Sequence, residues 1–186
     1  DIALKFKRHA IFAFYLYKMP SILDNVVNGL NLIHRVAKFG NNEMMKLIIG
    51  EGVDLNSTSE AGYTALHFAC QLGDVNLAYL LIENNANINV KDNWGNCPIH
   101  KAVINNHVDV VIMLSAIGAD TKIANINGKT IFDYHTNGLM KQVLYLLASN
   151  SLNKSSFFYN SDKDKKPQSI INELNLDHKK HSDYYA

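Results

Sequence analysis

Three histidines at a fixed spacing are the residues whose type and position could do chemistry in this chain. His34, His67 and His100 are each 33 residues apart. A zinc ion binds imidazole nitrogen at about 2.0–2.1 Å, so its ligands must converge on one point. Equivalent residues of stacked units lie about one helix packing distance apart, roughly 8–10 Å. We therefore predict no shared metal ion, and expect each imidazole to hydrogen-bond backbone near its own turn.

Other motifs for catalysis or cofactor binding are incomplete. Gly128-Lys129-Thr130 ends like a phosphate-binding loop, but Ile123 stands where the first glycine of that loop is required. His178 and His181 form a pair with no third or fourth ligand in view. The HExxH, GxSxG and CxxC motifs do not occur in the sequence. We predict no catalytic residue, no cofactor, no metal site and no enzymatic activity.

The histidines belong to a repeating unit. Gly29, Gly62, Gly95 and Gly128 follow the same 33-residue period, and each of the first three precedes a histidine by five residues. A fixed period of this length is typical of a solenoid, in which each unit buries its apolar face only against its neighbours. Each glycine lies in the turn ahead of an expected helix, where we predict a positive φ.

Apolar residues three or four positions apart predict a second helix in each unit. We expect them in the core, and they are Met44, Met45, Ile48 and Ile49, then Leu77, Leu80, Leu81 and Ile82, then Val110, Val111 and Leu114.

The units resemble the ankyrin repeat. The segments GYTALHFA from 62 and NCPIHKA from 96 keep most of its T-P-L-H-x-A signature, and Gly118-Ala119 keeps the ending of its second helix. The resemblance implies an all-α solenoid of helix-turn-helix units joined by β-hairpin-like turns. It also implies that partners bind along the concave face formed by turn tips and first helices.

The resemblance covers about residues 1–148, and the expected organisation follows from it. A partial repeat 1–27 is followed by repeats that begin at about 28, 61, 94 and 127. We expect a linker over 149–166 and a C-terminal tail with a short helix over 167–186. Asp133 replaces the histidine in the last unit, whose second helix is predicted over 139–148. We interpret this atypical unit as the C-terminal cap.

Composition and charge set the class of partner and compartment. The net charge of +1 and the pI near 7.9 offer no basic field for nucleic acid. The apolar run 10–17 is far shorter than the roughly 20 residues that cross a bilayer, so no membrane association is expected. Cys70 and Cys97 give no disulfide framework. We expect a monomer in the cytoplasm or nucleus.

The predicted binding residues are those that the repeat does not need for folding. Aromatic and aliphatic side chains gather there, and large exposed aromatics are typical binding anchors. Polar residues beside them would set the orientation of a partner. The predicted set is Phe39, Tyr63, Leu72, Lys91, Trp94, Asn96, Ile104 and Ile126. Scattered surface residues, or residues covered by the chain's own tail, are the alternative interpretation.

The sequence therefore predicts a non-enzymatic interaction module or scaffold whose partner is another protein. The alternative is a regulatory or substrate-docking domain of a larger enzyme, because the chain begins inside a repeat. Abundant Asn, Ile and Lys with few prolines, as AT-rich genomes tend to encode, make an effector delivered into a host cell a further hypothesis.

The resemblance also implies a modification. Members of the ankyrin family can be hydroxylated on the asparagine that follows the second helix. Asn56 and Asn89 match this position, with Ile48 and Leu81 eight residues earlier.

Overall fold

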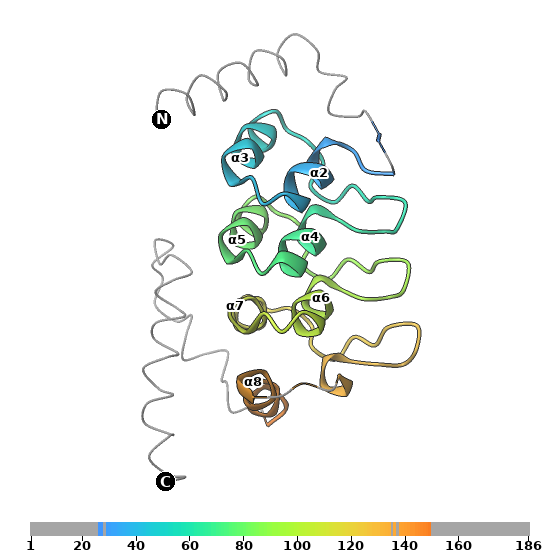
Figure 1. Ribbon diagram of the computed structural model, residues 1–186, viewed down its shortest axis with the longest axis vertical. Coiled ribbons are helices and arrows are strands. Elements are labelled where there is room, and N and C mark those ends of the chain that lie inside the picture. The colour runs from blue at the N-terminus through green and yellow to red at the C-terminus, as the bar shows by residue number, and fades with distance from the viewer. Residues whose placement is uncertain (1–25, 28, 135, 137, 150–186) are drawn as a thin grey trace.

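The protein is a row of stacked helix pairs (Figure 1). The computed structural model describes residues 26, 27, 29–134, 136 and 138–149. The first helices of successive units are α2 (Leu32–Lys38), α4 (Ala65–Leu72) and α6 (Pro98–Ile104), and the second helices are α3 (Asn42–Gly50), α5 (Val75–Glu83) and α7 (Val108–Ile117). The last unit has a 3₁₀ turn, η2 (Ile131–Asp133), and α8 (Gly138–Ala148). The predicted all-α class is confirmed.

The elements form layers that run along the stack. In Figure 1 the second helices lie on the left, the first helices lie in the middle, and the hairpin-like loops project to the right. Each first helix packs against the first helix of the next unit as well as against its own second helix. The hairpins and first helices consequently share one long surface.

Local sequence explains where the helices begin. Asn41 and Asp74 accept hydrogen bonds from the backbone N–H groups of Met44 (3.0 Å) and Leu77 (2.9 Å), which would otherwise have no partner. Pro98 is the first residue of α6, where its missing N–H leaves nothing unsatisfied.

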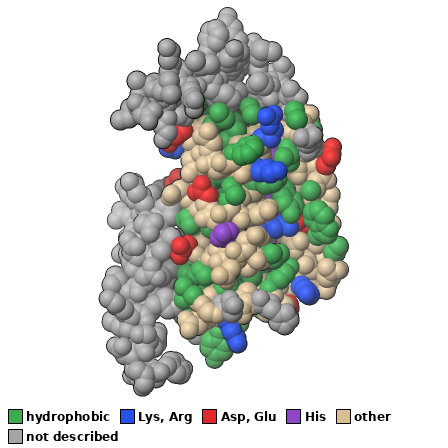
Figure 2. Space-filling model, in the orientation of Figure 1, with side chains coloured by type: hydrophobic (Ala, Val, Ile, Leu, Met, Phe, Trp, Pro, Cys, Tyr) green, Lys and Arg blue, Asp and Glu red, His purple; other side chains and the backbone are tan. Residues whose placement is uncertain are grey.

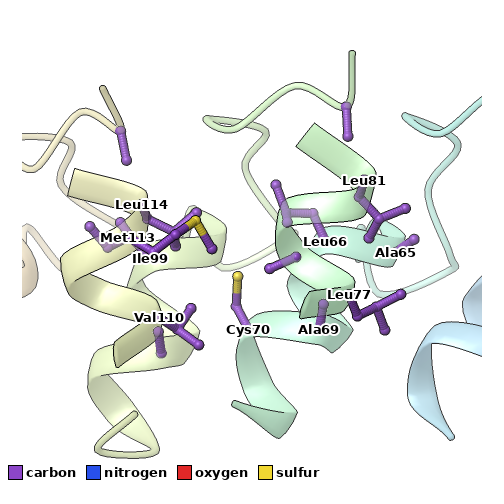
Figure 3. Packing of buried hydrophobic residues seen from close by; sticks show 14 of the residues in the cluster. Ala65, Leu66, Ala69, Cys70, Leu77, Leu81, Ile99, Val110, Met113 and Leu114 are labelled. Carbon is purple, nitrogen blue, oxygen red and sulfur yellow. The ribbon is translucent and has the colours of Figure 1, made fainter. Parts of the chain in front are cut away.

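The core follows the seam between helices of neighbouring units (Figure 3). Small residues on the first helices, including Ala69 and Cys70, let the backbones approach, and larger residues such as Leu77 and Met113 fill the space between second helices. The predicted core residues are buried or packed against this core. Burial also raises the pKa of the Cys70 thiol, which keeps it in its unreactive protonated form.

The hairpins stack closely because of the predicted glycines, all four of which have a positive φ between 71° and 76°. A Cβ at Gly62 would lie 2.7 Å from the backbone nitrogen of Asn93, and one at Gly95 would lie 2.9 Å from that of Ile126. The Asn93 N–H donates to the Ala61 carbonyl oxygen (3.1 Å), and the Ile126 N–H donates to the Trp94 carbonyl oxygen (3.0 Å). Backbone hydrogen bonds therefore connect one hairpin to the next.

The last unit departs from the others as its sequence indicates. Only a 3₁₀ turn forms where the earlier units have a helix of seven or eight residues. Its Asp133 carboxylate accepts hydrogen bonds from the Thr130 N–H (2.8 Å) and hydroxyl (2.7 Å). The predicted linker and C-terminal tail, and the partial repeat up to residue 25, lie outside the described residues.

Candidate functional site

Two of the three histidines, His34 and His67, join neighbouring units by hydrogen bonds. The His67 Nδ1 atom accepts hydrogen bonds from the Thr64 N–H (3.1 Å) and hydroxyl (2.9 Å) of its own unit, which places the ring proton on Nε2. Nε2 then donates to the Asn96 carbonyl oxygen in the following hairpin (3.0 Å). His34 Nε2 likewise lies 2.9 Å from the Ser57 carbonyl oxygen. His34 and His67 therefore fasten α2 and α4 to the next hairpin.

Burial keeps these rings neutral. It lowers the pKa of His67 to about 4, although the Asn96 carbonyl opposes the shift. Burial also lowers the pKa of His34 and His100. Within the described ranges no three His, Cys, Asp or Glu side chains are grouped so that they could hold a metal ion.

The predicted binding residues lie mostly on one surface. We call the exposed side of the hairpins together with α2, α4 and α6 the hairpin-side surface. Phe39 is 79% exposed and Ile126 67%, while Leu72, Trp94 and Ile104 are each close to half exposed, unusually high for such large apolar side chains. Figure 2 shows hydrophobic and basic side chains close together along the hairpin side.

Helical spacing connects the apolar side chains on the first helices. Phe68 and Leu72 are four residues apart on α4, and Lys101 and Ile104 are three apart on α6, so each pair shares one side of its helix. The Tyr63 ring is 5.3 Å from the Phe68 ring and 6.1 Å from the Trp94 ring, measured between centroids. The row of apolar side chains from α4 to the hairpin that carries Trp94 is thus continuous.

A buried ion pair lies beneath Trp94 and Tyr63. Lys101 Nζ is 2.6 Å from Asp92 Oδ2, and the Asp92 side chain is fully buried. The same ammonium lies 4.5 Å from the centroid of the Tyr63 ring and 5.6 Å from that of Trp94. Both distances suit cation–π attraction. Burial alone would lower the pKa of Lys101, but the hydrogen bond and charge of Asp92 outweigh it and raise the pKa.

Asp92 also shapes the hairpin that carries Trp94. Its Oδ1 atom accepts hydrogen bonds from the backbone N–H groups of Trp94 (2.9 Å) and Asn96 (2.8 Å). Asn125 does the same in the next hairpin, where its Oδ1 accepts from Asn127 and Lys129. The buried pair therefore fixes both the backbone and the ring of Trp94.

Sequence reasoning missed Lys101 and Asp92. Lys101 occupies the variable position of the T-P-L-H-x-A signature, which the other units fill with Arg35, Phe68 and Tyr134. Asp92 lies 33 residues after Ser59 and 33 before Asn125. These two positions contact each other in the structure: Lys101 pairs with Asp92, and in the next unit the Asn125 amide donates to the Tyr134 hydroxyl (3.1 Å). The signal in the sequence was that both positions change together from one unit to the next.

The two polar residues predicted to contact a partner, Asn96 and Lys91, differ in solvent exposure. Asn96 is buried, and its Oδ1 accepts hydrogen bonds from Asn125 (3.0 Å) and Tyr134 (3.2 Å). Its side chain therefore stabilises the junction between two hairpins and is not on the exposed surface. Lys91 is exposed and donates to the Ala124 carbonyl oxygen at 3.4 Å.

The two asparagines singled out for modification make equivalent contacts. Asn56 Oδ1 accepts a hydrogen bond from the Asn87 N–H (2.7 Å), and Asn89 Oδ1 accepts one from the Asp120 N–H (3.0 Å). Both side chains thus connect the loop after one second helix to the loop after the next.

Comparison with known proteins agrees with this architecture. The family model described as "Ankyrin repeats (3 copies)" matches three overlapping segments, 3–92, 33–125 and 76–156. The chain belongs to the ankyrin repeat family. Ankyrin repeats are protein-interaction modules that are typically non-catalytic, so this chain carries a protein-binding scaffold.

Several curated proteins contain similar ankyrin segments. Human BCL-6 corepressor-like protein 1 is 32% identical over 124 residues, which are 66% of this chain and 7% of that protein. Chicken nuclear factor NF-kappa-B p105 subunit is 35% identical over 119 residues, covering 62% and 12%. Arabidopsis thaliana serine/threonine-protein kinase 12 is 31% identical over 107 residues, covering 58% and 23%. The ankyrin array therefore matches only a small part of each relative.

No helix in the described part of this ankyrin chain is both long and apolar enough to span a membrane.

Proposed function

We propose that this ankyrin array is a non-enzymatic module that binds a protein partner on its hairpin-side surface, with Trp94 as the main anchor. The observation that carries the proposal is a half-exposed Trp94 ring held from below by the buried Lys101–Asp92 pair. A partner that binds a ring already fixed in place loses less conformational entropy on association.

The remaining anchors extend this contact along the array. Tyr63 packs against Trp94, and Leu72, Ile104 and Ile126 lie on the same surface. Phe39 marks the end of α2. Surface apolar residues of this size, when gathered instead of scattered, characterise interaction sites.

Replacing Trp94 and Tyr63 by alanine will weaken partner capture at least about 30-fold, because a single anchor of this type contributes about 2 kcal/mol or more. Wild-type and variant arrays are used as baits in lysates of candidate host cells, and captured proteins are quantified by mass spectrometry. Circular dichroism verifies that the variant stays folded. If the loss of Tyr63 destabilises the array, the single variant Trp94→Ala tests the same anchor with Tyr63 in place.

The matched control is Leu139→Ala with Tyr145→Ala. These residues are also exposed, at 46% and 73%, but belong to α8 on the second-helix side. A partner whose capture is unchanged by the Trp94 and Tyr63 replacements would contradict the proposed site. A captured host protein would additionally support the effector hypothesis and the localisation of this protein in the host cytoplasm or nucleus.

A second candidate function is docking within a larger enzyme. The relatives favour it, because the match covers only 23% of the Arabidopsis protein that is named a kinase. Sequencing the reading frame on both sides of this segment decides the matter. A frame without a catalytic domain would exclude it.

Asn56 and Asn89 are proposed hydroxylation sites. Each side chain accepts its hydrogen bond through Oδ1, so a hydroxyl group on Cβ leaves that contact intact. Incubation with an asparaginyl hydroxylase, dioxygen and the enzyme's reducing co-substrate should insert one atom of dioxygen into a Cβ–H bond at one or both asparagines, while the co-substrate takes up the other atom. The intact mass should rise by one or two oxygen atoms, and Asn56→Ala with Asn89→Ala should abolish the gain. An unchanged wild-type mass would refute the modification.

A further inference from the structure

Charged side chains are distributed unequally between the two sides of the array. Among the described residues, the exposed basic groups of the hairpin-side surface outnumber its exposed carboxylates: Arg35, Lys38, Lys91 and Lys129 against Glu60 and Asp133. On the second helices and the loops beside them the balance is reversed: Glu43, Glu51, Asp54, Asp74, Glu83, Asp109 and Asp120 against Lys46, Lys122 and Lys141. The neutral average of the chain conceals this segregation.

The other charges of the hairpin-side surface do not cancel its basic character. Lys101 and Asp92 neutralise each other in the interior. The Asp133 carboxylate keeps its negative charge and offsets part of the positive charge of Lys129. The Glu60 side chain lies over Gly29 in the preceding hairpin, while its backbone carbonyl accepts a hydrogen bond from the Asn93 amide (2.8 Å). Four exposed basic groups against two exposed carboxylates leave this surface with an excess of two positive charges, and Lys91 belongs to the hairpin that carries Trp94.

Basic and apolar side chains follow a fixed order along the hairpin-side surface. Arg35 and Lys38 lie on α2, the apolar anchors Leu72 and Trp94 belong to the middle units, and Lys129 lies on the last hairpin. Positive groups thus flank an apolar centre. A complementary ligand needs apolar side chains in the middle and negative charges on both sides.

We propose that the hairpin-side surface binds a protein segment in which Asp or Glu residues flank large apolar side chains. This inference rests on the proposed function, and adds the chemistry of the partner to it. Nucleic acid also carries negative charge, but its binding relies on a dense basic stripe. Here the four exposed basic groups are spread over three units, with apolar anchors between them.

The test uses short synthetic peptides without tryptophan. One set combines Leu and Phe anchors with Glu, a second set replaces every Glu by Gln, and a third replaces every Glu by Lys. Trp94 is the only tryptophan of the chain, so the change in its fluorescence reports binding at this site directly. We expect the Glu set to bind about tenfold more tightly than the Gln set, as two exposed ion pairs would provide. Added salt should remove most of this difference.

Matched variants locate the effect. Arg35→Glu with Lys38→Glu should abolish or reverse the preference for Glu peptides. Lys122→Glu with Lys141→Glu changes the net charge equally on the other side of the array and should leave the preference intact. Equal loss in both variants would overturn the inference, because it would show a response to net charge alone.

The remaining outcomes separate the two proposals. Peptides that bind at Trp94 without preferring Glu, or that prefer Lys, would refute the acidic partner and leave the proposed function standing. Binding of a polyuridine RNA probe in place of peptides would assign the surface to nucleic acid and overturn both proposals. If no peptide and no captured protein depends on Trp94 and Tyr63, the proposed function fails and the acidic partner fails with it.

Discussion

Replacing Lys101 by methionine will destabilise the array by about 3–5 kcal/mol, the usual cost of leaving one partner of a buried ion pair alone. Methionine keeps most of the side-chain length but not the charge. The fully buried Asp92 carboxylate then retains its two backbone N–H donors and loses its counter-ion. Urea denaturation followed by circular dichroism measures the change without relying on the fluorescence of nearby Trp94.

The next unit supplies the control for this variant. There, the equivalents of Asp92 and Lys101 are Asn125 and Tyr134, which form a neutral hydrogen-bonded pair. The double replacement Asp92→Asn with Lys101→Tyr should therefore recover most of the lost stability, as a double-mutant cycle would show. A Lys101→Met protein as stable as the wild type would mean that water already screens this pair.

The array will lose stability as the pH falls from about 6.5 towards 4. The pKa of His67 is about 4 in the folded protein and about 6.5 in the unfolded chain. Between these values the unfolded chain binds a proton that the folded protein does not, so the contribution is complete above pH 6.5 and declines below it. Each pKa unit corresponds to about 1.4 kcal/mol, which gives a loss of about 3 kcal/mol for His67.

The neighbouring histidines act in the same direction, because burial lowers the pKa of His34 and His100 as well. Denaturation curves at several pH values in this range measure the slope of stability against pH. His67→Gln should be less stable at neutral pH and should show a smaller slope. Identical slopes in the wild type and in His67→Gln would contradict the assigned role of this ring.

The repeat itself was predictable from the sequence because its rules are local and recur. Glycines with positive φ, a proline at a helix start and apolar residues at helical spacing each specify their own unit. The predicted hydrogen bonds from imidazole to backbone are present for His34 and His67, although the sequence did not reveal that these two rings reach into the following hairpin.

The candidate site was only partly predictable because it depends on contacts between units. The exposure of Phe39, Leu72, Trp94, Ile104 and Ile126 follows from their positions outside the repeat's core pattern. The burial of Asn96 and the ion pair beneath Trp94 depend instead on which residues neighbouring hairpins and helices carry. The T-P-L-H-x-A signature leaves the position of Lys101 unspecified, so matching it could not reveal the ion pair.

The histidine bonds give the array a direction. The His67 ring contacts its own helix start through Nδ1 and the hairpin that follows through Nε2, whereas Asp133 reproduces only the first of these contacts. An ionised carboxylate has no hydrogen-bond donor, so Asp133 cannot make the bond to a following hairpin that His67 makes through Nε2. Lengthening this protein by grafting a further repeat behind the last one would consequently call for a residue at 133 that, like His67, can both accept from its own helix start and donate to the added hairpin.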